Sequence, residues 1–347
     1  MTRKPVLECI PNFSEGRNTA TIHAIAEAIR SVSDVALLHI DTSYAANRTV
    51  MTFAGPPQAV AEAAFRAAEV AIAKIDMRTQ EGVHPRVGAV DVCPFVPLFD
   101  MTMDEAVQYA CMFAERVARA LHIPVYLYEY AARQAYRRAL PDIRKGQYEG
   151  LAKKMQLSEW KPDFGPDTPS PTAGAMITGA RDILVAFNIG LHTSDVTIAQ
   201  NIAVQLRESG GKIQGKGSYR KVNGLLPKLR AIGWHMADYN QAQVSCNLLD
   251  YKVTAPLQVW QTCAALAQEE QVPLNGSEVI GLIPEICVIE AGARQLREEG
   301  KCRLATKELL LEKGITYLQL DRLKPFIPQE KILEYTLESA GLLHYTT

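Results

Sequence analysis

The sequence lacks any large excess of charge of one sign and any long hydrophobic run. Its 347 residues include 37 Lys and Arg against 38 Asp and Glu, so the formal net charge is −1. A balance this even provides no global attraction to nucleic acid or to an anionic membrane surface. No apolar stretch approaches the roughly 18 residues that span a bilayer, and the apolar part of the N-terminus is too short for a signal peptide. We therefore expect a cytoplasmic protein that binds neither nucleic acid nor membranes.

Several signatures of known catalytic and cofactor sites are also missing. The chain has no Walker loop, no H-E-x-x-H motif and no G-x-S-x-G motif. Its seven histidines stand apart from one another, and its seven cysteines are scattered without a C-x-x-C pair. This spacing argues against a zinc site and is typical of reduced thiols in the cytoplasm. We expect no bound metal.

The length of the chain indicates more than one folding unit. A chain of 347 residues exceeds what a single compact core usually accommodates. Residues 160–174 contain four prolines and two glycines, which prevents a continuous helix. We predict that this segment is the crossover between two domains, residues 1–178 and 179–347, and that it is a candidate binding surface.

Both halves of the chain show the same order of predicted elements. Hydrophobic periodicity predicts strand–helix–strand–strand–helix–strand in each half, which is the order of a split βαβ, ferredoxin-like unit. Residues 47–56 and 240–247 occupy the same position in this order. The predicted fold is therefore α/β, or α+β, with two ferredoxin-like sublobes whose mixed sheets flank a central cleft. After residue 301 we predict a further helix, a short strand at residues 316–320 and a final helix near residues 330–340.

His84 differs from the other histidines in its surroundings. Gly82 lies two residues before it, and Pro85 directly after it fixes the next backbone torsion and restricts His84 to extended geometry. Gly88 permits the close approach of a ligand, and Arg86 supplies a bidentate donor for a carboxylate or phosphate. A histidine on such a rigid loop suits acid–base chemistry near neutral pH, but the pattern also fits a loop histidine that bonds to local backbone.

One glycine-rich loop is strongly basic. Its G-x-G at Gly215 and Gly217 lacks the third glycine of a dinucleotide fingerprint, and the loop follows a predicted helix instead of a strand. From Lys212 to Arg230 there are six basic residues and no acidic residue. Such a loop fits either the binding of an anionic ligand tail or a solvated connector.

Seven segments of the chain together carry a family resemblance. They are residues 8–17 (ECIPNFSEGR), 47–50 (NRTV), 84–95 (HPRVGAVDVCPF), 124–128 (PVYLY), 160–166 (WKPDFGP), 179–188 (GARDILVAFN) and 244–250 (VSCNLLD). In this order they resemble the glutamate formimidoyltransferase family, with similarity from about residue 5 to about residue 340. The animal members that this chain resembles carry the same module fused to a cyclodeaminase domain. Because this chain stops at Thr347, we expect that second activity to be absent.

The resemblance implies a homodimer of two-lobed α/β chains with a substrate tunnel and a folate-dependent reaction. N-formimidoylglutamate and tetrahydrofolate would yield glutamate and 5-formimidoyltetrahydrofolate, a step of histidine degradation, with tetrahydrofolate as co-substrate and no metal. By its His-Pro-Arg motif, the family's catalytic histidine falls on His84. The folate-contacting segment falls on Gly165, Pro166 and Gly174. Residues 167–173 depart from the family pattern, which suggests that these contacts are mostly made by backbone.

Two residues are assigned catalytic roles in this reaction. His84 would accept a proton from the attacking nitrogen of tetrahydrofolate and supply one to the glutamate nitrogen, because an amide anion is too poor a leaving group. Asp41, at the end of a predicted strand, is a candidate to orient the imidazole. The alternative for Asp41 is a turn or helix cap.

Arginine and asparagine side chains are candidates for binding the glutamate part of the substrate. Arg86 and Arg181 match the two carboxylates by fork geometry, and each could instead belong to a buried structural pair. Asn12 and Asn188 are candidates for neutral donors at strand ends.

The basic loop offers a site for the extra carboxylates of folylpolyglutamates, with Lys216, Arg220 and Lys221 as candidate contacts. Two other functions stay open at this point. One is formyl transfer from 5-formyltetrahydrofolate to glutamate. The other is a non-catalytic folate-binding protein, which would have no need of His84.

Overall fold

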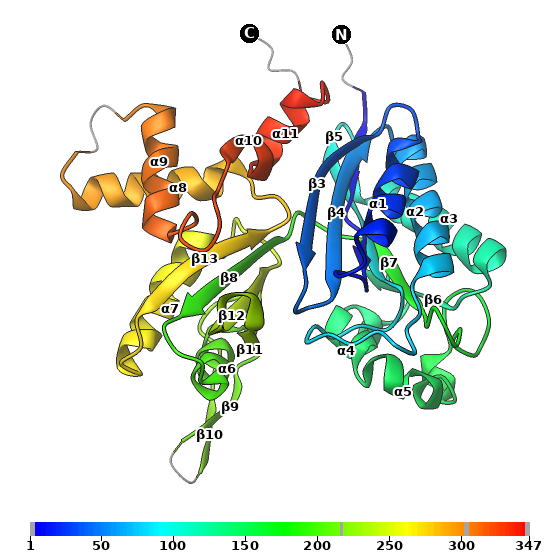
Figure 1. Cartoon of the computed structure of the whole chain (residues 1–347), viewed down its shortest axis with the longest axis horizontal. Helices are drawn as coiled ribbons and strands as arrows, with labels where there is room; N and C mark the ends of the chain where they lie inside the picture. Colours follow the sequence, from blue (N-terminus) through cyan, green and yellow to red (C-terminus); the bar gives the residue numbers. More distant parts are fainter. Residues whose placement is uncertain (1–3, 216–217, 302–304, 344–347) are drawn as a thin grey trace. The chain divides into compact units, whose positions relative to one another are not determined.

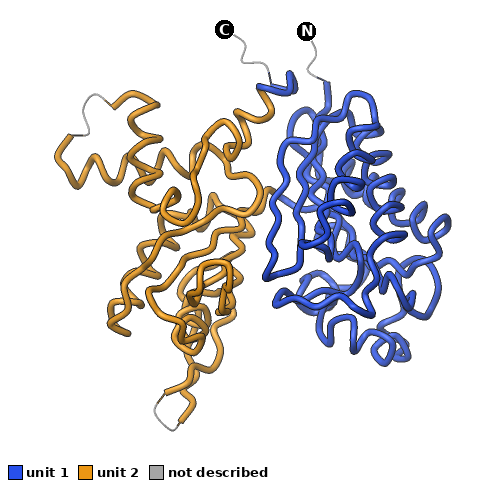
Figure 2. Tube along the Cα trace, viewed as in Figure 1, with its two compact units in different colours: residues 1–182, 339–347 blue, residues 183–338 orange. Residues whose placement is uncertain are grey.

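The computed structural model describes residues 4–215, 218–301 and 305–343, which divide into two compact units (Figure 2). Unit 1 comprises the described residues up to Asp182 together with 339–343, and unit 2 comprises the described residues of 183–338. The division lies after Asp182 instead of after residue 178, because the strand at Met176–Ala180 pairs with strands of unit 1. In the described ranges, no helix has both the length and the apolar character needed to cross a membrane.

Unit 1 is built on a seven-stranded sheet (Figure 1). Its strands are β1 (Val6–Cys9), β2 (Asn12–Phe13), β3 (Ala36–Ser43), β4 (Arg48–Gly55), β5 (Val90–Phe99), β6 (Val125–Glu129) and β7 (Met176–Ala180). Four of them are antiparallel neighbours in the order β3–β4–β1–β5, and β2 lies between β4 and β5. Strands β7 and β6 extend the sheet from β5 in parallel.

Helices pack on both faces of this sheet. They are α1 (Thr19–Arg30), α2 (Pro57–Lys74), α3 (Met103–Leu121), α4 (Leu140–Arg144) and α5 (Gln147–Lys154), with 3-10 turns η1 (Ala135–Arg137) and η2 (Ser158–Trp160). Helices α1, α2 and α3 lie on one face, as Figure 1 shows, and pack on Leu7, Phe53 and Phe95. Ile143 of α4 and Leu151 of α5 pack on the opposite face beside β5, β6 and β7.

Unit 2 contains a four-stranded antiparallel sheet and a separate hairpin. The sheet strands are β8 (Val185–Leu191), β11 (Leu229–Met236), β12 (Gln241–Leu248) and β13 (Leu274–Ile280), and the hairpin strands are β9 (Gly211–Gln214) and β10 (Tyr219–Val222). The helices are α6 (Val196–Leu206), α7 (Pro256–Glu269), α8 (Glu285–Glu298), α9 (Lys307–Leu318), α10 (Pro328–Lys331) and α11 (Leu333–Ser339), with the 3-10 turn η3 (Ala237–Tyr239). Alternate residues of β8, such as Phe187 and Ile189, point into an apolar core with α6 and α7.

The predicted α/β class with two ferredoxin-like sublobes is confirmed, because the two sheets share one topology, although the sheet of unit 2 is antiparallel instead of mixed. The central cleft stays a prediction. In unit 2 the order β11–β12–β8–β13 repeats the order β3–β4–β1–β5 of unit 1. Each is the arrangement of a split βαβ unit, in which the first and third strands of the motif lie at the centre. Asn47 and Asn240 precede the third strand of their units, both in the left-handed backbone conformation, with φ of 46° and 48°.

One predicted strand was wrong, and two elements of the structure were not predicted. The strand predicted at residues 316–320 overlaps helix α9, in spite of the strand propensity of Ile315 to Tyr317. Close packing explains the difference, because Gly292 of α8 approaches α9 so nearly that an added Cβ would lie 1.8 Å from the carbonyl oxygen of Leu310. Strand β7 and the β9–β10 hairpin were not predicted, since neither has an alternating pattern long enough to stand out.

Gly88 provides a test of how tightly the His84 loop is packed. A Cβ at Gly88 would lie 2.1 Å from the carbonyl oxygen of Ala175 and 2.5 Å from that of Ala173. We expect Gly88→Ala to lower the free energy of unfolding by about 1–3 kcal/mol, because backbone must move to admit the methyl group. Urea denaturation would measure the change.

Gly150 is the matched control for this substitution. It lies within α5, and a Cβ there would meet nothing within 4 Å. Gly150→Ala should therefore raise the free energy of unfolding by about 0.5–1 kcal/mol, the usual gain of alanine over glycine inside a helix. Equal effects of the two substitutions would show that the packing around Gly88 is not restrictive.

Candidate functional site

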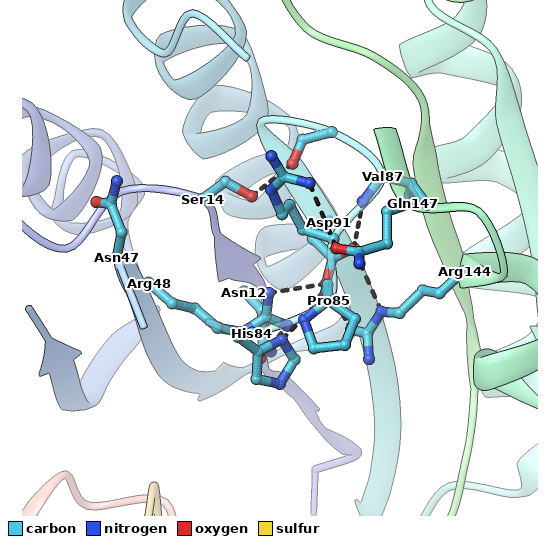
Figure 3. A network of polar contacts seen from close by, with 12 residues as sticks. Asn12, Ser14, Asn47, Arg48, His84, Pro85, Val87, Asp91, Arg144 and Gln147 are labelled. Atoms are coloured by element: carbon cyan, nitrogen blue, oxygen red, sulfur yellow. Dashed lines mark hydrogen bonds and ion pairs between the residues drawn. The ribbon is translucent and has the colours of Figure 1, made fainter. Parts of the chain in front are cut away.

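The centre of the candidate site is the carboxylate of Asp91, buried in β5 between two valines. Its side chain has no exposed surface, and it accepts the backbone N–H of Val87 at 3.0 Å. Nη1 of Arg48 lies 2.8 Å from its Oδ2, and Nη2 of Arg144 lies 2.5 Å from the same atom (Figure 3). Nε of Arg144 also donates to Oδ1 at 3.3 Å. We call Arg48, Asp91 and Arg144 the Asp91 cluster.

The members of the Asp91 cluster come from three elements that the fold brings together. Arg48 is the first residue of β4, directly after the left-handed turn at Asn47, and Arg144 is the last residue of α4. Oδ1 of Asn12, on β2, accepts from Nε and Nη2 of Arg48 at 3.2 and 2.9 Å. Asn12 in turn donates to the carbonyl oxygen of Ile10 at 2.8 Å, so its amide orientation is fixed.

His84 lies on the loop that leads into this cluster, with its ring drawn beside it in Figure 3. Its Nδ1 is 2.8 Å from the carbonyl oxygen of Pro85. Because a carbonyl oxygen only accepts, Nδ1 must carry the proton in the neutral ring. This tautomer makes Nε2 the ring atom that can accept a proton from a substrate.

Burial and the neighbouring charges together set the protonation of His84. Burial lowers its pKa well below the ordinary value of 6.5, and the guanidinium groups of Arg48 and Arg144 lower it further, against the opposing charge of Asp91. Burial would raise the pKa of Asp91, but the charges of Arg144 and Arg48 outweigh it and bring that pKa down to about 2. At neutral pH the site therefore holds a neutral imidazole, one carboxylate and two guanidinium groups.

Arg86 is a structural residue in this arrangement. Its Nε donates to the side-chain oxygen of Gln80 and its Nη2 to the Gln80 carbonyl oxygen, at 2.7 and 3.0 Å. Both Nη atoms bind the Glu149 carboxylate, and Nη1 also donates to Gln147. These contacts occupy all of the N–H donors of a guanidinium group. Arg86 is thus paired in this structure with Glu149, whose side chain is 62% exposed, and its role in binding a substrate carboxylate stays a prediction.

Arg181 lies directly after β7, near Glu8 and Tyr128. It donates to the carbonyl oxygen of Asp182 at 2.8 Å. Burial raises the pKa of Glu8 to about 7 and that of Tyr128 to about 12, and in both cases the Arg181 charge opposes the shift. Its role in binding a substrate carboxylate stays a prediction.

Asp41 lies on β3 beside His39, with 3.4 Å between Oδ2 of Asp41 and Nε2 of His39. The two residues are separated by one position on the strand, so their side chains point to the same face. The contact described for Asp41 is therefore with a different histidine from the predicted one. Orientation of His84 by Asp41 stays a prediction.

Asn188 belongs to a polar network of unit 2 centred on Glu278. Its Nδ2 donates to Oε1 of Glu278 at 3.4 Å, and Nε2 of Gln243 donates to the same oxygen at 3.1 Å. The hydroxyl of Tyr239 donates to Oε2 at 2.8 Å. Asn188 is thus oriented by a carboxylate that sequence reasoning did not single out.

The predicted folate segment has backbone features that require its glycines. Gly165 has a φ of 88°, and an added Cβ would lie 2.4 Å from the carbonyl oxygen of Ile123. Gly174 has a φ of 68°, and an added Cβ would lie 2.2 Å from the carbonyl oxygen of Val87. A hollow of about 560 Å³ lies beside Gly165 and Pro166. Contact of folate with Gly165, Pro166 and Gly174 stays a prediction.

The basic loop is a hairpin in the residues that the structure describes. Lys221 on β10 pairs directly with Lys212 on β9, and Arg220 pairs with Ile213. Two like charges placed opposite each other on one face destabilise a hairpin, so an anion bound there would relieve the repulsion. Lys216 lies outside the described residues.

The sequence analysis missed Arg48, Asp91 and Arg144 as site residues. Asp91 could have been found, because it is a lone acidic residue in the apolar strand 90–97, and a buried carboxylate requires cationic partners. Arg144 carries no such signal, since only the fold brings α4 to β5. Among the described residues, no group of three or more His, Cys, Asp or Glu side chains is arranged to hold a metal ion.

Fold and site together define a two-unit α/β protein with a neutral histidine beside an arginine–aspartate cluster. The family model "Formiminotransferase domain, N-terminal subdomain" matches residues 6–181, and the model "Formiminotransferase domain" matches residues 186–338. The chain therefore belongs to the formiminotransferase family.

Curated relatives include stand-alone and bifunctional proteins. The glutamate formimidoyltransferase of Streptococcus pyogenes is 40% identical over 85% of this chain and 94% of its own length, and that of Thermoplasma acidophilum is 37% identical over 85% and 93%. The formimidoyltransferase-cyclodeaminase of Rattus norvegicus is 44% identical over 97% of this chain. The chain spans 60% of the length of that bifunctional relative.

Asp91→Asn tests whether the Asp91 cluster stabilises the fold. The substitution leaves two buried guanidinium groups without their shared anion, so we expect the free energy of unfolding to fall by about 3–5 kcal/mol at neutral pH. Because the pKa of Asp91 is about 2 against an ordinary 3.8, this contribution is present above pH 3.8 and is lost as the pH falls through 2. Urea denaturation at several pH values measures both effects.

The control is Asp76→Asn, which removes an ion pair with Arg78 that lies on the surface. It should leave the unfolding midpoint unchanged within error. An Asp91 variant as stable as this control would show that the cluster does not hold unit 1 together.

Proposed function

We propose that this protein is a glutamate formimidoyltransferase that transfers the formimidoyl group of N-formimidoyl-L-glutamate to N5 of tetrahydrofolate. The observation that carries the proposal is the neutral His84, held beside the Asp91 cluster in a chain of the formiminotransferase family. The stand-alone relatives of Streptococcus pyogenes and Thermoplasma acidophilum, named glutamate formimidoyltransferases, support it over most of the chain.

The reaction needs a group that first accepts and then donates a proton. N5 of tetrahydrofolate forms a bond to the carbon of the protonated formimidoyl group, the electron pair of the C=N π bond moves to its terminal nitrogen, and N5 gives its proton to Nε2 of His84. The tetrahedral intermediate then breaks its bond to the glutamate nitrogen, which takes the proton from His84, while the lone pair of the terminal nitrogen re-forms the C=N bond. A neutral imidazole is the correct starting state for this sequence, and tetrahydrofolate takes part as a co-substrate.

Location and assembly stay predictions of the same proposal. The six cysteines in the described part of the chain are all free thiols, which supports a reducing compartment such as the cytoplasm. A homodimer follows from the family resemblance alone.

His84→Ala tests the acid–base role. Turnover should fall by about 10²–10⁴-fold, the usual contribution of general acid–base catalysis, with tetrahydrofolate binding nearly unchanged. In the wild type, the acidic limb of kcat/KM should lie below pH 6.5, because a lowered pKa keeps His84 neutral as the pH falls through that value. The limb should be absent from the variant.

His23 on α1 is the control, since its side chain is exposed on the helix. His23→Ala should keep both the turnover and the pH profile of the wild type. If His84→Ala turns over within threefold of the wild type, then His84 is not the proton-transfer residue.

The β9–β10 hairpin provides a test of polyglutamate binding. Replacing Lys212, Arg220 and Lys221 by glutamine should weaken the binding of polyglutamyl folate more than that of monoglutamyl folate. Each exposed pair contributes only about 0–1 kcal/mol, so the effect should be graded, and it should shrink as salt is raised. Fluorescence titration with both ligands at two salt concentrations measures it.

A control variant removes the same charge elsewhere, at the exposed residues Lys74, Arg119 and Lys153. It should bind both ligands as the wild type does. Equal losses of both ligands in the hairpin variant at low salt would assign the hairpin to solubility or structure.

A further inference from the structure

The Asp91 cluster carries more positive charge than negative charge. Two guanidinium groups face one carboxylate, and the side chains of Arg48 and Arg144 are only 8% and 13% exposed. Among the described residues, Asp91 and Arg144 are the charged groups that shift the pKa of Arg48. Burying an unbalanced charge is costly, so the surplus indicates a place where an anion binds.

Arg144 also has N–H donors that Asp91 does not occupy. Arg144 directs Nε and Nη2 to Asp91, and its Nη1 makes no hydrogen bond within the described part of the chain. Arg86, from the neighbouring loop, differs in that its donors are occupied by Gln80, Gln147 and Glu149. Of these arginines, Arg144 is thus the one whose Nη1 can donate a hydrogen bond to a ligand.

The chemistry of the proposed reaction determines which anion belongs there. In N-formimidoylglutamate the nitrogen that leaves is bonded to Cα, and the α-carboxylate is bonded to the same carbon. A histidine that protonates this nitrogen must therefore lie close to the α-carboxylate. Arg48 and Arg144 are two cations whose charges act on His84.

We propose that Arg48 and Arg144, oriented by Asp91, bind the α-carboxylate of the glutamate-type substrate beside His84. This assignment rests on the proposed function and identifies a subsite within it. Arg144 forms a charge-assisted hydrogen bond through Nη1, and Arg48 contributes mainly its charge, because Asn12 and Asp91 already accept from it.

The subsite links substrate binding to proton transfer. A bound carboxylate cancels the surplus positive charge of the cluster, so it removes part of the cause of the low pKa of His84. Within unit 1 the charges that act on the imidazole include those of Arg48 from β4, Arg144 from α4 and Asp91 from β5, beside the hydrogen bond to the Pro85 carbonyl oxygen. The pKa of His84 therefore rises when substrate binds, which suits a group that must then hold a proton and deliver it to the glutamate nitrogen.

Calorimetry with L-glutamate and its α-amide, L-isoglutamine, tests the subsite without folate or turnover. The wild type should bind L-glutamate more tightly than L-isoglutamine, which lacks the α-carboxylate. Arg144→Gln should weaken L-glutamate binding about 10- to 100-fold, the range for a hydrogen bond to a charged group, and should abolish the preference. The control Arg78→Gln, at an exposed arginine, should keep both affinities.

A measurement on the wild type avoids any folding defect of the variant. The pKa of His84, followed by nuclear magnetic resonance and assigned with His84→Gln, should rise when L-glutamate is saturating and stay unchanged with L-isoglutamine. Wild-type affinity of Arg144→Gln for L-glutamate, or an unchanged pKa with L-glutamate, would overturn the proposal. If the wild type discriminates between the two ligands but transfers no formimidoyl group, the subsite stands and the proposed reaction is wrong.

Discussion

Burial of one carboxylate, that of Asp91, is the constraint on which the candidate site depends. A carboxylate without exposed surface is tolerated only with cations and hydrogen-bond donors around it. Asp91 obtains them from the start of β4, from the end of α4 and from the backbone of Val87. The loop that carries His84 ends in this network. The interactions that stabilise buried Asp91 therefore also position the loop that carries His84.

The electrostatic consequence is that the same arginine charges stabilise buried Asp91 and act on His84. Arg48 and Arg144 compensate the buried charge of Asp91, yet together they exceed it and add to the effect of burial, which lowers the pKa of His84. Arg86, only two residues from His84, has no part in this, since Glu149 and its other acceptors occupy it. Proximity in sequence was thus a poor guide to which arginine acts at the histidine.

The two units show how one topology supports different polar sites. Both place the first and third strands of a split βαβ motif at the centre of the sheet and cover one face with helices. Unit 1 adds β6, β7, α4 and α5, and these elements supply Arg144. Unit 2 lacks an equivalent of the Asp91 cluster among its described residues and instead gathers Asn188 and Gln243 around Glu278.

The sequence by itself determined the class of fold and the family, and it singled out His84 as the candidate histidine. These depend on local patterns, namely hydrophobic periodicity, the order of elements and short motifs, which are read without knowing what lies nearby in space. It did not determine the partners of that histidine. Arg144 and Asp91 are 53 positions apart, and their pairing arises only because α4 packs on the sheet beside β5. Tertiary structure decided the site because charge–charge interactions depend on distance in space, and the chain path between the partners leaves no trace in local pattern.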